Sequence, residues 1–290
     1  MYERILVPTD GSAASEAAIE TALTLARRFD ATLYAIHVLE LDELPPEFDA
    51  GARAELQTRA ESLLATIADW ADDASVSTVT EVVEPVGLVR QAIVDYLDEQ
   101  DVDLVVMGTQ GRTGLHELVL GSVTERTLRL SPIPVLTVHE ETELDPEFDA
   151  ILVPTDGSEV ANAAADHGIE LAGRADAALH ALHVVDVTGF WTDVDSPAVL
   201  SALEEAGQRA VDDVVDRASE AGLGSVEASV SSGTPASGIV DYADDRDVDL
   251  IVMGTHGRTG LDRFLLGSVA EKVVRVSDIP VLAVSVDPEQ

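Results

Sequence analysis

Apolar and polar positions follow two different patterns along this chain. Short apolar runs, typical of buried strands, are separated by segments in which apolar residues recur every three or four positions, as in helices with one buried face. In the first half we predict strands at 5–7, 32–38, 76–83, 104–107 and 135–138, with helices after Ser12 and at 52–72, 88–99 and 123–130. Strands separated by helices of this length favour β-α-β units on a parallel sheet, which is an α/β fold.

The same pattern occurs twice. The segment 151–158 repeats 5–12, and 254–268 repeats 108–122, both at an offset of 146 residues. We therefore expect two tandem domains of five strands each. Their predicted bounds are 1–140 and 148–288, with an acidic linker at 141–147.

A glycine-rich loop follows the fourth strand of each half. It reads G-T-Q-G-R-T-G-L-H-E-L-V-L-G-S at 108–122 and G-T-H-G-R-T-G-L-D-R-F-L-L-G-S at 254–268. Glycine has no Cβ, so backbone N–H groups can converge on one ligand. Ser122 with Glu125 has the spacing of a capping box, and so has Ser268 with Glu271, which predicts helices beginning there. Because a helix N-terminus attracts anions, the sequence predicts two phosphate-binding loops, with tight unliganded turns as the alternative.

The composition is strongly acidic. Of 290 residues, 55 are Asp or Glu and 17 are Lys or Arg, which gives a formal net charge of −38. Since 46% of the residues are apolar, the charge indicates a folded protein with an acidic surface rather than disorder. Such surfaces are typical of proteins from salt-loving organisms, and we expect this protein to come from a halophilic archaeon. In roughly molar salt the Debye length falls to about 3 Å and self-repulsion is screened.

The sequence also argues against several classes of function. Nucleic-acid binding needs clustered Lys and Arg, which this chain lacks. It has no cysteine, hence no disulfide or thiolate site, and no apolar run long enough for a membrane span. Its first residues do not have the layout of a signal peptide, so we expect a cytoplasmic protein without membrane or nucleic-acid partners.

Three motifs together resemble the universal stress protein family. They are a first strand ending in P-T-D-G-S, a second strand ending in H-V, and G-x2-G-x9-G-S after the fourth strand, present in both halves. The last motif resembles the ATP-binding branch of that family. The resemblance implies two doubly wound domains of the adenine nucleotide alpha hydrolase-like kind, each with strand order 3-2-1-4-5. It also implies a nucleotide across the ends of strands one and four.

The resemblance implies a role for each matching residue. Asp10 and Asp156 would accept hydrogen bonds from ribose hydroxyls, and the main chains of Val38 and Val184 would contact the adenine edge. The phosphate cradles would consist of Gly108, Gly111, Gly121 and Ser122 in the first half and Gly254, Gly257, Gly267 and Ser268 in the second.

Further residues of these motifs are weaker candidates. Arg112 and Arg258 could pair with the phosphate tail or be solvated loop charges. The turn also holds Thr9 and Thr155 as candidate contacts, and Asp10 could instead cap the following helix. Beside the proposed adenine contact, His37 and His183 are better explained as packed or backbone-bonded histidines. Mg²⁺ would arrive with the nucleotide through phosphate oxygens rather than in a protein cage.

The resemblance implies an ATP-binding stress or signalling module, with ADP or AMP as alternative ligands. No G-x4-G-K-[ST] motif is present, so we expect little or no turnover. A slow ATPase or adenylyl-transferring enzyme of the same fold, and an interaction protein with empty loops, are the alternatives.

The two predicted sites need not be equivalent. Glu117 corresponds to Arg263, and Glu84 to the region of Ser231, so we expect the second half to bind ATP more tightly. Family members commonly dimerise through the last strand. The tandem chain could make that contact internally, pairing 135–138 with 281–284, and could form a further homodimer.

Overall fold

The computed structural model describes residues 1–39, 50–84, 89–111, 120–142, 148–187, 197–257 and 266–286. Contacts divide the chain into two compact units, unit 1 at 1–146 and unit 2 at 147–290. None of the helices in these described ranges is long and apolar enough to cross a bilayer.

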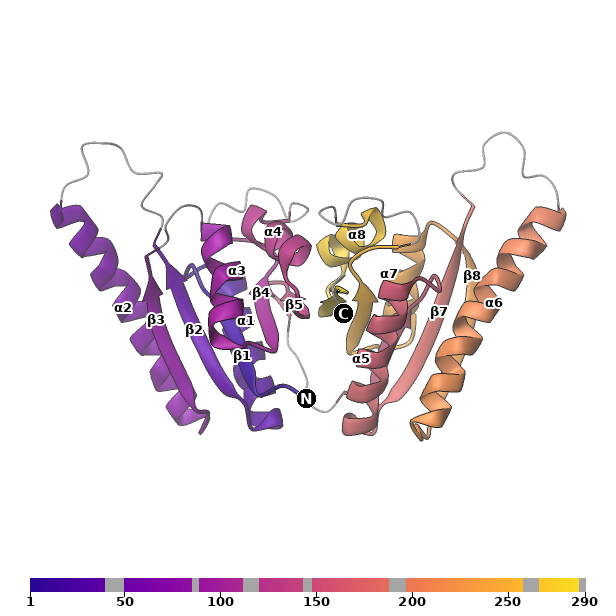
Figure 1. Ribbon diagram of the computed structural model, residues 1–290, viewed down its shortest axis with the longest axis horizontal. Coiled ribbons are helices and arrows are strands. Elements are labelled where there is room, and N and C mark those ends of the chain that lie inside the picture. Colours follow the sequence, from indigo (N-terminus) through magenta and orange to yellow (C-terminus); the bar gives the residue numbers. More distant parts are fainter. Residues whose placement is uncertain are drawn as a thin grey trace. The chain divides into compact units, whose positions relative to one another are not determined.

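Unit 1 is a parallel sheet covered by helices (Figure 1), which confirms the predicted α/β class. Its elements are β1 (Arg4–Pro8), α1 (Ala13–Phe29), β2 (Thr32–Val38), α2 (Ala50–Asp73), β3 (Thr78–Val83), α3 (Val89–Gln100), β4 (Leu104–Gly108), α4 (Ser122–Leu130) and β5 (Val135–Val138). Parallel pairing of β1 with β2 and β4, of β2 with β3 and of β4 with β5 orders the strands β3-β2-β1-β4-β5. Strand β3 begins two residues later than predicted, because Val76 N–H bonds to Ala71 O and closes the end of α2.

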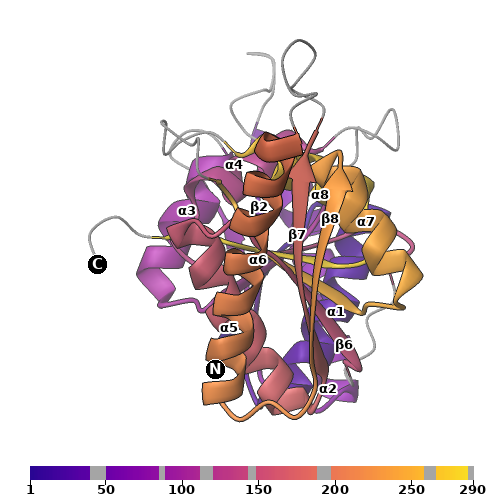
Figure 2. The same ribbon diagram turned by 90° about the vertical axis from the view of Figure 1, so that its right-hand side faces the viewer.

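Unit 2 repeats this arrangement with the order β8-β7-β6-β9-β10. Its elements are β6 (Ala150–Pro154), α5 (Glu159–Ala175), β7 (Ala178–Asp186), α6 (Pro197–Glu220), β8 (Val226–Gly233), α7 (Pro235–Asp245), β9 (Leu250–Gly254), α8 (Ser268–Val276) and β10 (Val281–Val284). Figure 2 faces this unit and shows α5 and α6 on one side of β7 and β8, with α7 on the other. A sheet with both faces covered explains the continuous apolar strands in the sequence.

The two central strands of each unit separate toward their carboxyl ends. Strand β1 pairs with β4 only at Ile5–Leu104 and Leu6–Val105, and then the ladder stops. Strands β2 and β5 continue the sheet in opposite directions from this pair, so the gap is the topological switch point at which open α/β sheets bind ligands. In unit 2 the pairing of β6 with β9 likewise ends after Leu152–Ile251.

Small residues bring α1 close to this switch point. Ala14, Ala18 and Ala22 are buried on its inner face, so the helix packs tightly over β4. The helix begins after Ser12, whose side chain accepts a hydrogen bond from Ser15 N–H (3.3 Å), as expected for a helix cap. The turn between β1 and α1 is therefore held at the edge of the gap.

Candidate functional site

In each unit a pocket lies at the gap between the central strands, lined by described residues. The cavity of unit 1 is about 390 Å³ and that of unit 2 about 380 Å³, both within the range of small-molecule sites. In unit 1 the lining includes Thr9, Asp10 and Val38, followed along the chain by Gly108, Gly111, Gly121 and Ser122. The corresponding lining in unit 2 includes Thr155, Asp156, Val184, Gly254, Gly257, Gly267 and Ser268. These predicted residues, up to 113 positions apart in the sequence, thus surround one cavity in each unit.

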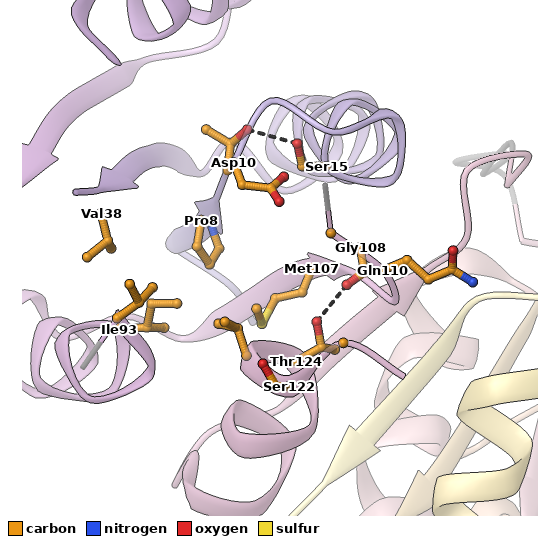
Figure 3. A pocket seen from close by; sticks show the side chains of 15 residues that line it. Pro8, Asp10, Ser15, Val38, Ile93, Met107, Gly108, Gln110, Ser122 and Thr124 are labelled. Carbon is orange, nitrogen blue, oxygen red and sulfur yellow. Dashed lines mark hydrogen bonds between the residues drawn. The ribbon is translucent and has the colours of Figure 1, made fainter. Parts of the chain in front are cut away.

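One wall of the unit 1 pocket is apolar. Pro8, Val38, Ile93 and Met107 face the same space from β1, β2, α3 and β4 (Figure 3). Unit 2 presents Pro154, Val184, Ile239 and Met253 in the same way. Such a wall suits a flat, weakly polar ring.

The backbone N–H and C=O of Val38 face the pocket beside this apolar wall. Thr9 N–H donates to Ile36 O (2.9 Å), so the backbone groups of Ile36 face β1. Leu39 N–H donates to Val83 O (2.9 Å), so those of Leu39 face β3. Since the direction alternates along a strand, the N–H and C=O of Val38 face the side on which β1 has already ended. They are placed to pair with the edge of a ligand.

Strand β7 extends this edge further in unit 2. Thr155 N–H donates to Leu182 O (2.8 Å), so the same alternation directs the backbone groups of Val184 toward the pocket. Pairing continues to Asp186 with Gly233, two residues beyond the end of β2 in unit 1. Asp186 lines the second pocket.

A compact turn places the carboxylate of Asp10. Its Oδ1 accepts from Ser12 N–H (3.0 Å), while Thr9 Oγ1 accepts from Gly11 N–H (3.2 Å). The capping alternative for Asp10 is wrong, because the helix cap is the hydroxyl of Ser12. In unit 2, Asp156 Oδ1 accepts from Ser158 N–H (2.9 Å) in the same geometry. The carboxylate is oriented by the turn at the edge of the cavity.

The glycine loop crosses close to that carboxylate. A Cβ on Gly111 would lie 2.8 Å from Asp10 Oδ2, and one on Gly257 would lie 2.8 Å from Asp156 Oδ2. Earlier in the loop, a Cβ on Gly108 would lie 2.6 Å from the carbonyl oxygen of Ala14. Only glycine permits both approaches without displacing a neighbour.

The loop ends at a helix N-terminus, but the predicted capping box is wrong. Gly121 is the N-cap (φ −62°, ψ 139°), and no side chain accepts a hydrogen bond there. Backbone bonds hold it instead, since Gly121 N–H donates to Thr109 O (2.8 Å) and Glu125 N–H to Gly121 O (2.8 Å). Ser122 is thus the first helical residue, with an exposed side chain in the pocket lining. The same correction applies to Ser268, because Gly267 is the N-cap of α8.

Both units match one family model, described as the universal stress protein family, at residues 1–139 and 147–285. The chain belongs to the universal stress protein family. A universal stress protein of Methanocaldococcus jannaschii is 43% identical over 143 residues, covering 47% of this chain and 82% of that protein. One of Mycolicibacterium smegmatis is 27% identical over 297 residues, covering 97% and 96%.

A solved structure supports the tandem fold over the whole chain. The crystal structure of a universal stress protein from Archaeoglobus fulgidus is similar with a TM-score of 0.75 and 25% sequence identity. The likeness covers 99% of this chain and 97% of the other. The expectation of a tandem universal stress protein with two α/β domains is confirmed.

In this universal stress protein His37 of β2 and His183 of β7 are bonded to the backbone, as expected. His37 Nδ1 lies 2.8 Å from Thr9 O, and His183 Nδ1 lies 2.7 Å from Thr155 O. A carbonyl can only accept, so Nδ1 carries the proton in both rings. Each histidine therefore ties the turn after the first strand of its unit to the second strand.

Some candidates lie outside the described residues. These are Arg112 and Arg258, together with Glu117 and Arg263 on which the expected difference in affinity partly rested. The pocket linings as described contain no Lys or Arg. Nor do the described parts of the chain contain a group of His, Asp and Glu placed to hold a metal ion.

Glu84 should contribute less to the expected difference in ATP affinity between the two units than its charge suggests. Its carboxylate forms an ion pair with Arg53 of α2, and both side chains are about half exposed. A neighbouring cation and solvent both screen its repulsion of a bound anion.

Proposed function

We propose that each unit binds an adenine nucleotide, with ATP as the preferred ligand and ADP or AMP as alternatives. One observation carries the proposal. An apolar wall, an oriented carboxylate and a glycine cradle ending at a helix N-terminus surround one cavity, and the arrangement occurs in both units.

Each part of the pocket corresponds to one part of the ligand. The base would stack between Ile93 and Met107 with its edge on the main chain of Val38, which offers one donor and one acceptor. A ribose hydroxyl would donate to Asp10. The phosphates would lie at the N-terminus of α4, where backbone N–H groups and the helix dipole favour negative charge. Unit 2 would bind its ligand with the equivalent residues.

The cofactor chemistry follows from the phosphates. Mg²⁺ would bind phosphate oxygens and water, because it retains several waters and seldom needs an all-protein cage. The cradle contacts phosphates equally before and during hydrolysis, so it favours binding over rate. We therefore propose a nucleotide-dependent stress or signalling module with little or no turnover.

Titration calorimetry with ATP and Mg²⁺ in high salt tests the proposal. We expect saturable binding that is lost at one site in Gly111→Val, at the other in Gly257→Val, and at both in the double variant. The bulky side chains would displace the carboxylates of Asp10 and Asp156 from the cavities. A flat titration up to millimolar ATP contradicts the proposal and favours an interaction protein with empty loops.

Phosphate release assays separate binding from the enzymatic alternative. We expect no ATP-dependent release above that of the Gly111→Val, Gly257→Val double variant. Turnover that disappears in Asp156→Ala would instead support a slow ATPase or adenylyl-transferring enzyme. Pairing of 135–138 with 281–284, and a further homodimer, stay predictions of the sequence.

A further inference from the structure

One helix position differs between the two pockets and changes what the adjacent threonine can do. Ser15 lines the pocket of unit 1 from the first turn of α1. Ala161 takes that place in α5 and lines the pocket of unit 2. The backbone is the same at both places, since Ser15 N–H bonds to Ser12 Oγ and Ala161 N–H to Ser158 Oγ.

In unit 1 the threonine hydroxyl is fully used within the protein. Ser15 Oγ donates to the carbonyl oxygen of Ser12 (2.8 Å), which cannot donate in return. The contact between Thr9 Oγ1 and Ser15 Oγ (3.0 Å; dashed in Figure 3) must therefore have Thr9 as the donor. Thr9 Oγ1 also accepts from Gly11 N–H (3.2 Å). Its proton is not available to a ligand.

In unit 2 the equivalent proton has no acceptor within the described part of the chain. Thr155 Oγ1 accepts from Gly157 N–H (3.1 Å), as Thr9 does from Gly11. The methyl side chain of Ala161 cannot accept a hydrogen bond. Thr155 is only 5% exposed, so solvent reaches its hydroxyl poorly. A buried donor without an acceptor is unfavourable, and a ligand atom with a lone pair would remove that cost.

The neighbouring carboxylate indicates which ligand group this is. Thr155 and Asp156 are consecutive, and both side chains accept from amides of one turn, those of Gly157 and Ser158. A ribose hydroxyl is both a donor and an acceptor, and so can bond to a carboxylate and a hydroxyl together.

Building on the proposed nucleotide site, we infer that Thr155 donates to the ribose hydroxyl that Asp156 accepts from, so that unit 2 selects ribonucleotides more strongly than unit 1. In unit 1 the Thr9 hydroxyl cannot donate to this group, because its proton goes to Ser15. Ser15 and Ala161 thus set the sugar selectivity of the two sites through the hydroxyls of Thr9 and Thr155.

Reciprocal exchange of these two residues tests the inference. Each site is isolated first, unit 2 in a Gly111→Val background and unit 1 in a Gly257→Val background. Calorimetric dissociation constants are then measured for ATP, 2′-deoxy-ATP and 3′-deoxy-ATP with Mg²⁺. We expect Ala161→Ser to weaken ATP binding at unit 2 by about fivefold, the value of one hydrogen bond, and to lower its preference for ATP over one deoxy analogue. Ser15→Ala should strengthen ATP binding at unit 1 and raise its preference for ATP over that deoxy analogue.

A second pair of variants addresses the hydroxyl itself. Thr155→Val should behave like Ala161→Ser, whereas Thr155→Ser should retain the sugar preference, since it keeps the donor. Thermal unfolding of each variant reports whether the fold is retained. ATP binding with a sugar preference unchanged by both exchanges would overturn the inference and leave the proposed function standing. Absence of ATP binding in the wild-type protein would overturn both.

Discussion

Gly111 lies so close to Asp10 that a Cβ on the glycine would stand 2.8 Å from the Oδ2 atom. The atom in the way is the end of a side chain, which can rotate. We predict that Gly111→Ala displaces the carboxylate and weakens nucleotide binding at unit 1 at least about tenfold, comparable to the loss of a charge-assisted hydrogen bond. The free energy of unfolding should change by less than about 0.5 kcal/mol.

Calorimetry in the Gly257→Val background measures that affinity without interference from unit 2. Gly257→Ala is the matched variant, because its Cβ would stand 2.8 Å from Asp156 Oδ2. Unchanged affinity in both alanine variants would show that these carboxylates do not contact the ligand.

Gly108 has the opposite role, because its close neighbour is backbone. A Cβ there would lie 2.6 Å from Ala14 O, and neither α1 nor β4 can move without repacking. We predict that Gly108→Ala lowers the free energy of unfolding by about 1–3 kcal/mol, the usual cost of overpacking. Denaturant unfolding measures it, and Gly224→Ala serves as the control because nothing lies within 4 Å of its Cβ position. Equal stability of the two variants would contradict the close approach.

A buried histidine in unit 2 gives a pH prediction. Burial lowers the pKa of His180 below its ordinary value of 6.5, nearby Glu227 acts in the opposite direction, and Arg246 lowers it further. Its Nδ1 lies 3.2 Å from the hydroxyl of Tyr242 on α7, and Arg246 pairs with Glu227 (2.9 Å). The neutral ring can accept from that hydroxyl, whereas the protonated ring cannot.

Because the unfolded chain protonates His180 more readily than the folded chain does, acid favours unfolding. The contribution of His180 to stability is complete above pH 6.5 and is lost as the pH falls from there through the lowered pKa. Unit 1 has Tyr34 at this position, so His180→Tyr is the matched control. We predict that, as the pH is lowered from 7.5 to 5, the free energy of unfolding of the wild-type protein falls relative to that of His180→Tyr. A difference that is independent of pH would contradict the assignment.

The acidic surface predicts a dependence on salt. With a formal net charge of −38, self-repulsion at low ionic strength should destabilise both units. We expect the melting temperature to rise steadily from dilute buffer to molar KCl as the Debye length falls from about 10 Å to about 3 Å. Calorimetric melting measures this. Equal melting temperatures across the series would refute the proposed adaptation to salt.

Residues that carry a motif could be placed from the sequence. The internal repeat put Asp10 and Gly111 in matched contexts with Asp156 and Gly257, and a parallel sheet brings the carboxyl ends of its strands to one edge. The apolar wall was missed, although Ile93 has a counterpart at the repeat offset. An isoleucine on a helix looks the same in sequence whether it faces a core or a cavity.

Other features required backbone geometry. Ser122 has the spacing of a helix cap, but Gly121 is the N-cap and is held by backbone bonds to Thr109 and Glu125, and Ser122 lines the pocket instead. The hydrogen bond between Thr9 and Ser15 joins a turn to a helix. The sequence alone therefore does not show that Ala161, in place of the serine, removes a partner of Thr155. These relations depend on distances that no periodicity encodes.

Native mass spectrometry of the whole chain in concentrated ammonium acetate with ATP and Mg²⁺ reports directly whether each unit binds one nucleotide. We predict two successive nucleotide adducts on the wild-type protein, one on Gly111→Val, one on Gly257→Val, and none on the double variant. A wild-type protein that carries no adduct at millimolar ATP, or a double variant that still carries two, would contradict it.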